Sequence, residues 1–212
     1  MILDGIENVE WGQHDETAVK WKNLINGEEY AIGNRMFKEN GLEWINTSTL
    51  TIVPPCILGE DFFLSDKTIE FVGDSAATTY NNVGLRGQSS FGFYQNMYGS
   101  SPNRYYNTNI YAYNIGSWPF FQWQYEHDGV FENEHHRSAL VMQNSYVQPY
   151  YEGNTKLYNR KATIPSYTTG FTSFIWAGRI GCRCHCIRIY NRALSAKEVM
   201  HNYNIDKVRF GL

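Results

Sequence analysis

Carboxylates near the middle of the sequence are the first candidates for chemistry. Glu126 and Asp128 lie in an alternating segment, and Glu132 follows shortly after. Hydrolysis of a glycosidic bond with retention needs two carboxyl groups about 5 to 5.5 Å apart. On a straight strand Glu132 would lie about 20 Å from Glu126, and Asp128-Gly129 is typical of a turn. We therefore expect a solvated strand end with no catalytic residues, and the sequence predicts that the chain is not an enzyme.

Histidines and glutamates next to this segment raise the question of a metal site. Adjacent histidines in a polar loop are more often exposed to solvent than bound to metal, so we expect no metal ion here. A calcium ion held at the rim of a sheet by carboxylates and backbone carbonyls stays open. The residues concerned are His127, Glu132, Glu134, His135 and His136.

Three cysteines, Cys182, Cys184 and Cys186, alternate with other residues near the C-terminus. In a strand, side chains two positions apart share a face with Cα atoms about 6.6 Å apart, near the upper limit for a disulfide. Zinc ligands normally come from tight turns rather than from such a run. We expect free thiols that act as small apolar side chains, and these indicate assembly in a reducing compartment.

The segment from Phe91 to Tyr125 is rich in tyrosine, asparagine, serine and glycine. Sugar recognition uses this mixture, because aromatic rings cover the apolar side of a pyranose while amides and hydroxyls bind its hydroxyl groups. The same composition suits a protein interface. The candidate ligand-binding residues are Tyr98, Asn103, Arg104, Tyr111, Tyr113, Trp118, Glu126 and Asp128.

The candidate residues above lie among short segments rich in β-branched and aromatic residues. Frequent turn residues separate these segments. This pattern is typical of an all-β sandwich or barrel. Alternation predicts half-buried strands at Thr49–Ile52 and Thr68–Phe71, and a strand from Phe121 with one packed and one wet face. Further strands are expected at 138–143, 156–161, 171–176 and 183–190.

One helix signal stands out near the C-terminus. Ser195 and Glu198 have the spacing of a capping box, and Leu194 and Val199 that of a hydrophobic staple. These signals predict a short helix over 196–203. A second segment, 15–21, is either a helical turn or an irregular loop held by a buried tryptophan.

Composition and charge exclude several classes of function. The 18 Lys and Arg residues against 21 Asp and Glu residues give a net charge of −3 without a basic run, which argues against nucleic-acid binding. No stretch approaches the roughly 18 apolar residues of a membrane helix, and the start lacks the pattern of a secretory signal. We expect a soluble chain, without membrane insertion or an export signal, that folds as one domain over 1–212.

Both ends of the chain carry runs that point to a known fold family. The runs are 4–8, 21–27, 151–159 and 187–195, the last followed by Glu198 and Asn202-Tyr203. They resemble the opening segment, the penultimate hairpin, and the closing strand and helix of laminin G-like, concanavalin A-like lectin/glucanase domains. The middle, about 78–138, is covered poorly.

The resemblance implies a jelly roll of two antiparallel sheets that binds ligands on its concave face or at rim loops. Such domains mostly bind glycans or proteins, and variants of this pattern are frequent in surface proteins of gut bacteria and in structural proteins of phages. Glycosidases of this fold carry Glu-x-Asp-x-Glu or Glu-x-Asp-x-x-Glu on one strand, and the spacing of Glu126, Asp128 and Glu132 departs from both forms.

These observations predict an all-β, two-sheet antiparallel jelly-roll sandwich with a short C-terminal helix. The expected function is a non-catalytic, glycan-binding recognition module on a phage virion or another extracellular assembly. Its partner would be a glycan or a host-surface receptor. One alternative is a structural domain that binds neighbouring virion subunits, and another is a glycoside hydrolase of the same fold.

Overall fold

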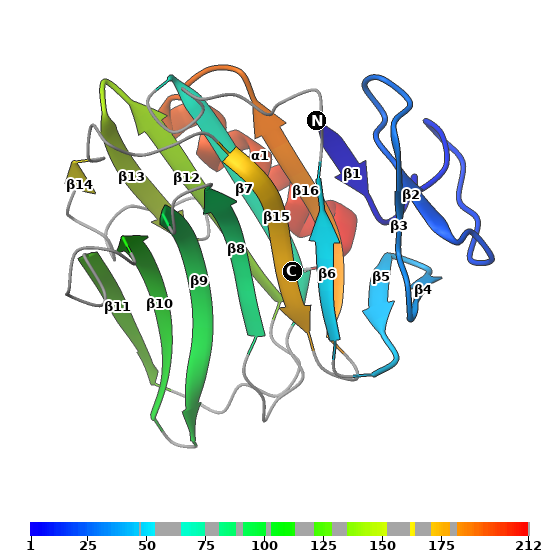
Figure 1. Ribbon diagram of the computed structural model, residues 1–212, viewed down its shortest axis with the longest axis horizontal. Coiled ribbons are helices and arrows are strands. Elements are labelled where there is room, and N and C mark those ends of the chain that lie inside the picture. The colour runs from blue at the N-terminus through cyan, green and yellow to red at the C-terminus, as the bar shows by residue number, and fades with distance from the viewer. Residues whose placement is uncertain are drawn as a thin grey trace.

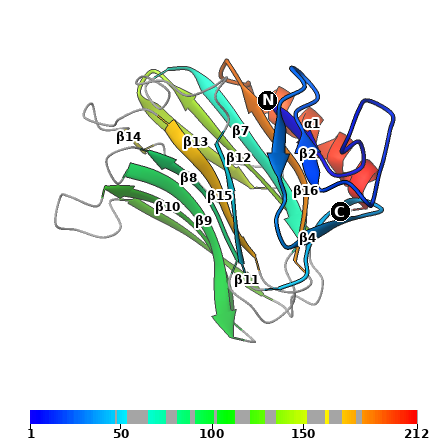
Figure 2. The same cartoon turned by 45° about the vertical axis from the view of Figure 1, so that its right-hand side comes forward.

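Two antiparallel β-sheets lie face to face in the computed structural model, and one C-terminal helix packs against the larger of them (Figures 1 and 2). The structure describes residues 1–46, 48–53, 65–74, 81–87, 91–100, 103–112, 121–128, 135–151, 162–163, 171–178 and 182–211. Every strand pairing among them is antiparallel. The predicted all-β class is therefore confirmed, whereas the jelly roll and the single domain stay predictions.

The larger sheet has eight strands and the smaller one six. The first runs in the order β14 (Ala162–Thr163), β13 (Tyr146–Tyr151), β12 (His135–Gln143), β7 (Lys67–Asp74), β16 (Arg183–Tyr190), β5 (Gly41–Trp44) and β4 (Arg35–Lys38), with β1 (Ile2–Asp4) also paired to β16. The second runs in the order β11 (Phe121–Asp128), β10 (Asn103–Ala112), β9 (Phe91–Ser100), β8 (Asn81–Gly87), β15 (Phe171–Gly178) and β6 (Ser48–Ile52). Strands β2 (Lys20–Lys22) and β3 (Glu29–Ala31) form a separate hairpin.

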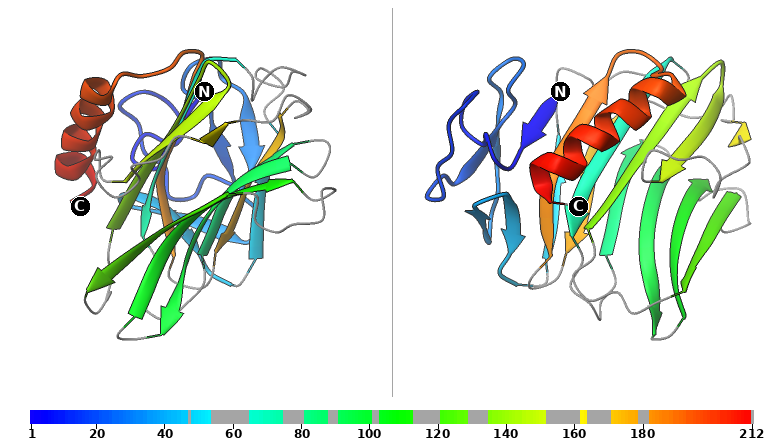
Figure 3. Two further views of the ribbon diagram at one scale, coloured as in Figure 1. Left: turned by 90° about the vertical axis from the view of Figure 1, so that its left-hand side faces the viewer. Right: turned by 180° about the vertical axis from the view of Figure 1, so that it is seen from behind.

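Helix α1 (Ala196–Phe210) covers the outer face of the eight-stranded sheet (Figure 3). The capping box between Ser195 and Glu198 is confirmed, and Leu194 and Val199 belong to one buried cluster, as a staple requires. The predicted end at residue 203 is wrong. Helix α1 continues until Gly211, whose positive φ of 71° closes it with a hydrogen bond to the Lys207 carbonyl. Its last turns are held by tertiary contacts, which a capping signal does not reveal.

The helix also changes the environment of β7. Alternation predicted that Ile69 and Phe71 are buried while Thr68 and Glu70 face water. Instead Thr68 and Glu70 are also fully buried. This expectation is wrong because α1 lies over the face that the isolated strand pattern left to solvent.

A network of charged side chains fixes α1 to this sheet. Arg137 on β12 donates from Nε to Asp206 of the helix at 2.7 Å, and from Nη2 to Glu70 on β7. Arg188 on β16 donates from Nη2 to the other oxygen of Asp206 at 2.6 Å. The side chains of Arg137, Glu70 and Asp206 are 0% exposed. Two arginines face two carboxylates, so the formal charges of the buried cluster cancel.

Polar neighbours complete this network. The hydroxyl of Tyr190 donates to Glu70 at 3.2 Å, and the amide of Asn202 donates to the Tyr190 hydroxyl oxygen at 3.1 Å. Burial, together with the negative charge of Glu70, raises the pKa of Tyr190 well above its usual range. Tyr190 therefore stays protonated and acts as a donor. Because these groups meet under the helix, we interpret the network as structural.

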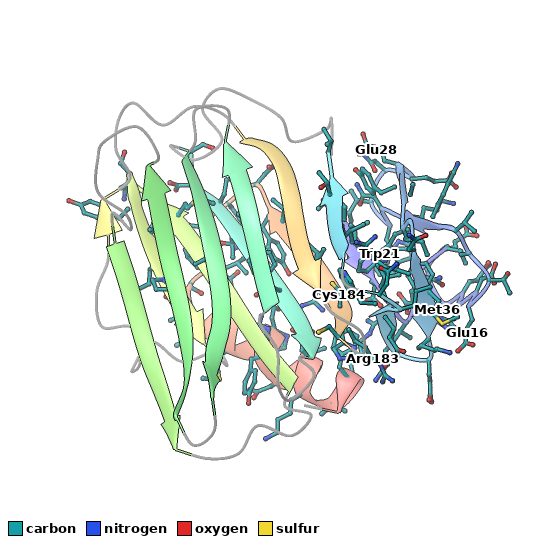
Figure 4. All side chains as sticks on the ribbon, turned by 60° about the horizontal axis from the view of Figure 1, so that its bottom comes forward. Glu16, Trp21, Glu28, Met36, Arg183 and Cys184 are labelled. Carbon is teal, nitrogen blue, oxygen red and sulfur yellow. The ribbon has the colours of Figure 1, made fainter. Side chains whose placement is uncertain are left out.

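The N-terminal segment lies against β16 and the β4–β5 hairpin (Figure 4). Trp21 is fully buried, and its Nε1 donates to the Asp4 carbonyl at 2.9 Å. Residues 15–19 form an irregular segment rather than a helical turn, and strand β2 begins at Lys20. The alternative, an irregular loop held by a buried tryptophan, is therefore correct for these residues, although Trp21 itself lies in β2. Asp15 instead accepts two hydrogen bonds from Thr17, from its amide at 2.8 Å and its hydroxyl at 2.6 Å.

A bulge in β16 alters the cysteine run. Cys182, Cys184 and Cys186 are buried and form no disulfide, as expected. However, the register with β7 shifts between Cys184, opposite Gly73, and Cys186, opposite Val72. The simple alternation that would place both on one face is therefore broken. The bulge accommodates the His185 ring, which stacks on Phe210 of α1 with ring centroids 5.3 Å apart.

Two glycines allow the first strand to reach this bulge. A Cβ on Gly5 would lie 2.5 Å from the Cα of Gly41, and one on Gly41 would lie 2.9 Å from the carbonyl oxygen of Cys184. The Gly5 amide donates to the His185 carbonyl at 2.7 Å. Only residues without a Cβ fit this approach, which explains a requirement for glycine at both positions.

Most of the other predicted strands occur in the structure. The predicted strand at 183–190 is confirmed, and those at 138–143 and 171–176 lie within β12 and β15. The predicted strand at 156–161 lies outside the described residues. In the part of the chain that the structure describes, no helix has the length and apolar character needed to cross a membrane.

The buried network predicts that Arg137 contributes much more to the free energy of unfolding than an exposed arginine does. Arg137→Met leaves Asp206 and Glu70 with less positive charge in a buried site, so we expect a loss of about 3 to 5 kcal/mol in the free energy of unfolding. Urea denaturation measures it. Arg192→Met is the matched control, because the ion pair of Arg192 with Glu198 is 58% and 43% exposed and exposed pairs contribute little. Equal unfolding midpoints for the two variants would contradict this interpretation.

The cap of α1 predicts a pH-dependent contribution to stability. The Arg192 side chain, followed by the Ser195 amide and hydroxyl, lowers the pKa of Glu198 from 4.5 to about 2. A lowered folded-state pKa gives a stabilising contribution that is present above about pH 4.5 and is lost as the pH falls towards 2. Solvent screening keeps this contribution small, because Glu198 and Arg192 are exposed. The difference in Tm between the wild type and Glu198→Gln should therefore be largest at neutral pH and shrink below pH 4.5. The exposed control Glu10→Gln should show no such trend.

Candidate functional site

Strands β9, β10 and β11 bring the chemistry-bearing residues of the middle segment into register. Tyr98 pairs with Tyr105, which pairs with Glu126 on the next strand. Directly paired residues share a face of a sheet, as do residues two apart on one strand. This face therefore holds a continuous set of polar and aromatic residues. Its members are Tyr94, Asn96, Tyr98 and Ser100 on β9, Asn103, Tyr105, Asn107, Asn109 and Tyr111 on β10, and Gln122, Gln124, Glu126 and Asp128 on β11.

Strand β6 shows on which side of the sandwich this face lies. Leu50 and Ile52 are 2% and 1% exposed, while Thr51 between them is exposed. Thr51 pairs across the sheet, through β15 and β8, with Tyr94. The polar residues therefore belong to the outer face of the six-stranded sheet. We call this set, from Tyr94 to Asp128 as defined above, the polar face.

The opposite face of the same sheet has a different composition. Starting from buried Ile52, the register passes through apolar residues on every strand. This row consists of Ile52, Phe174, Leu85, Phe93, Ile110 and Phe121. The hydrophobic effect therefore fixes the orientation of the sheet, because the reverse orientation would expose this row to water.

The register brings most of the predicted site residues together. Tyr98, Asn103, Tyr111, Glu126 and Asp128 all belong to the polar face. Arg104 does not, because it pairs with Gly99 and His127 on the other face. Tyr113 and Trp118 lie outside the described residues, as does Glu132.

Several residues of the polar face were not among the predicted site residues. Tyr105 lies between Tyr98 and Glu126, and Asn107 lies between Asn96 and Gln124. The alternation of polar and apolar residues in each strand was the signal that could have found them. The pairing between strands was not available from the sequence.

Negative residues lie at one end of the polar face, and a positive residue lies just beyond its other end. Glu126 and Asp128 lie at one end of β11. At the other end, Arg86 on β8 pairs with Gly92, which pairs with Tyr111. Neighbouring strands lie about 4.8 Å apart, and alternate residues about 6.6 Å apart. The register thus arranges aromatic and amide residues in parallel rows on one face of the sheet.

Metal binding finds no support among the described side chains, where no cluster of three or more His, Cys, Asp or Glu residues occurs. Of the histidine and glutamate group considered above, Glu132 and Glu134 lie outside the described residues. A calcium ion at the rim stays a prediction.

Comparison with known proteins identifies the fold but no family. No protein-family model matches the sequence, and no curated protein matches it. Trypanosoma rangeli sialidase in complex with sialic acid is similar with a TM-score of 0.65 at 14% identity, over 98% of this chain and 33% of that one. The binding domain of botulinum neurotoxin DC in complex with SialylT matches with a TM-score of 0.54 at 9% identity, over 90% of this chain and 51% of that one.

These structures share the overall fold of this chain but little of its sequence. Identities of 9% and 14% show a shared all-β fold and nothing finer, and the concanavalin A-like family is not confirmed. The chain spans about one third of the length of the sialidase chains that it matches.

The expectation that this chain is not an enzyme is contradicted. Solved structures that share its fold over 98% of its length are sialidases, which are enzymes. The distance between Glu126 and Glu132 along a strand excludes only one pair of catalytic carboxylates, and other pairs stay possible. We therefore withdraw that expectation.

Proposed function

We propose that this chain recognises glycans for a glycan-hydrolysing protein and binds them on the polar face of the six-stranded sheet. The observation that carries this proposal is the register of β9, β10 and β11, which gathers tyrosines, asparagines and glutamines on one outer face. Tyrosine rings stack on sugars, and amides satisfy sugar hydroxyls in pairs. The sialidase and toxin structures of similar fold are complexes with sialic acid and SialylT, which supports a sugar as the ligand.

Charged residues at the two ends of this face would orient a bound glycan that carries an acidic sugar. A carboxylate-bearing sugar would be attracted to the end near Arg86 and repelled by Glu126 and Asp128. Neutral sugars would occupy the rows between these ends. The concanavalin A-like family and the virion or other extracellular setting stay predictions from the sequence, as does a host-surface receptor as partner.

Loss of a central tyrosine tests recognition. Tyr105→Ala removes an aromatic group from the middle of the polar face, so we expect affinity for the best ligand on a glycan array to fall about tenfold, the effect of one stacking contact. Calorimetric titration measures it. Trp11→Ala is the matched control, since Trp11 is an aromatic residue that is 54% exposed in the N-terminal segment. Absence of saturable glycan binding, or equal affinity for Tyr105→Ala and the wild type, would refute the proposal.

A second candidate function, hydrolysis by this chain itself, is favoured by Glu126 and Asp128. They lie two residues apart on β11 and on one face, with Cα atoms about 6.6 Å apart. Inverting glycosidases hold their carboxyl groups about 6.5 to 9.5 Å apart. The register therefore gives two carboxylate residues at neighbouring positions on one face of β11, which is the minimum that a carboxylate pair requires.

Turnover of the neutral polysaccharides laminarin and agarose tests this second function. We expect reducing-sugar release with inverted anomeric configuration, observed by NMR, and its loss in Glu126→Gln and in Asp128→Asn while glycan binding is kept. Glu16→Gln, an exposed carboxylate of the N-terminal segment (Figure 4), is the control and should keep full activity. If Glu126→Gln turns over as fast as the wild type, these carboxylates are not catalytic.

A further inference from the structure

A pocket of about 220 Å³ lies on the other side of the sandwich from the polar face, where the β12–β13 hairpin meets the start of α1. Val141 and Gln143 on β12, and Tyr146, Gln148 and Tyr150 on β13, line it together with the first residues of the helix. The pairs Gln143 with Tyr146 and Val141 with Gln148 place these residues on one face of the hairpin. Helix α1 begins at Ala196 and covers only part of that face.

The floor and the rim of this pocket differ in chemistry. Val141, Tyr150 and Leu194 belong to one buried apolar cluster, and they are at most 8% exposed. Tyr146, by contrast, is 46% exposed, and Gln143 is exposed as well. The pocket therefore combines an apolar floor with an accessible aromatic ring and amide groups.

A tight hairpin turn precedes Tyr146 and fixes the position of its backbone. Asn144 and Ser145 both have positive φ, 51° and 61°, which is the backbone of a tight two-residue turn that joins paired strands. The Asn144 amide also donates to Asp66 at 3.2 Å. The turn and this hydrogen bond fix the backbone next to Tyr146, so that binding requires little ordering of the main chain there.

The electrostatics of the pocket point to an uncharged ligand. None of the described residues that line it carries a formal charge. The start of α1 would attract an anion, but Glu198 already accepts hydrogen bonds there, from the Ser195 amide and hydroxyl, each at 2.8 Å. Glu198 is in turn paired with Arg192 at 2.7 Å, so these two charges offset each other, and no lining residue supplies a charge that would hold an ionic ligand.

We propose that this pocket binds a single neutral sugar ring, stacked on Tyr146 and hydrogen-bonded by Gln143 and Gln148. The inference rests on the proposed function for the class of ligand, but it concerns a separate site on the opposite side of the molecule. The chain would then bear two glycan sites, one extended and one the size of a single ring.

Substitution of Tyr146 tests this second site with methyl glycosides of glucose, galactose, mannose and N-acetylglucosamine as probes. We expect at least one probe to shift the NMR signals of the amides of 141–150 and 195–198, and Tyr146→Ala to weaken this binding about tenfold. Tyr146→Phe should keep it, because stacking uses the ring. Free sialic acid should leave these amides unshifted.

Controls on the other side separate the two sites. Tyr105→Ala should leave the shifts of 141–150 unchanged, while Tyr146→Ala should leave binding on the polar face unchanged. If none of the four probes shifts these amides, or if Tyr146→Ala binds as tightly as the wild type, the pocket is not a sugar site. That result would leave the polar face to be judged by Tyr105→Ala alone.

Discussion

The buried contact between Arg137, Glu70 and Asp206 determines how the rest of the molecule can be used. Burying charges is costly unless they are paired and hydrogen-bonded, and here β7, β12 and α1 each supply one of the three groups. If the helix left the sheet, these charges would be exposed to water or would remain buried without a partner. The outer face under α1 is therefore closed, and a ligand must approach the outer face of the six-stranded sheet or the part of the β12–β13 hairpin that α1 leaves uncovered.

The local parts of this fold could be predicted, because local physics determines them. The capping box at Ser195 and the alternation at Leu50, Thr51 and Ile52 depend on neighbours in sequence, and both are as expected. Glu70 was misplaced since its burial depends on Asp206 and Arg137, which are distant in the chain. The bulge at His185 likewise arises from contacts with α1 and with the first strand, which alternation within β16 cannot show.

The same division holds for the candidate sites. Composition directed attention to the tyrosine-rich middle segment, and alternation placed Glu126 and Asp128 with the glutamines of β11. Arg104 was grouped with Asn103 although adjacent strand residues lie on opposite faces. The pocket beside Tyr146 was missed because its walls come from a hairpin and from a helix start that are far apart in sequence, and neither part is unusual by itself.

Two sites on opposite sides of a sandwich have a consequence for affinity. Linked sites raise affinity only when one ligand can span both of them, and a short oligosaccharide cannot pass around the sheets from the polar face to the pocket at α1. Each site would therefore bind a separate chain or a separate branch. Under the proposed function, such an arrangement would favour attachment to a dense glycan surface, where many chains are within reach, over tight binding of one soluble sugar. A pocket that held a single ring would suit this mode, because dissociation from one branch would leave a glycan on the polar face bound.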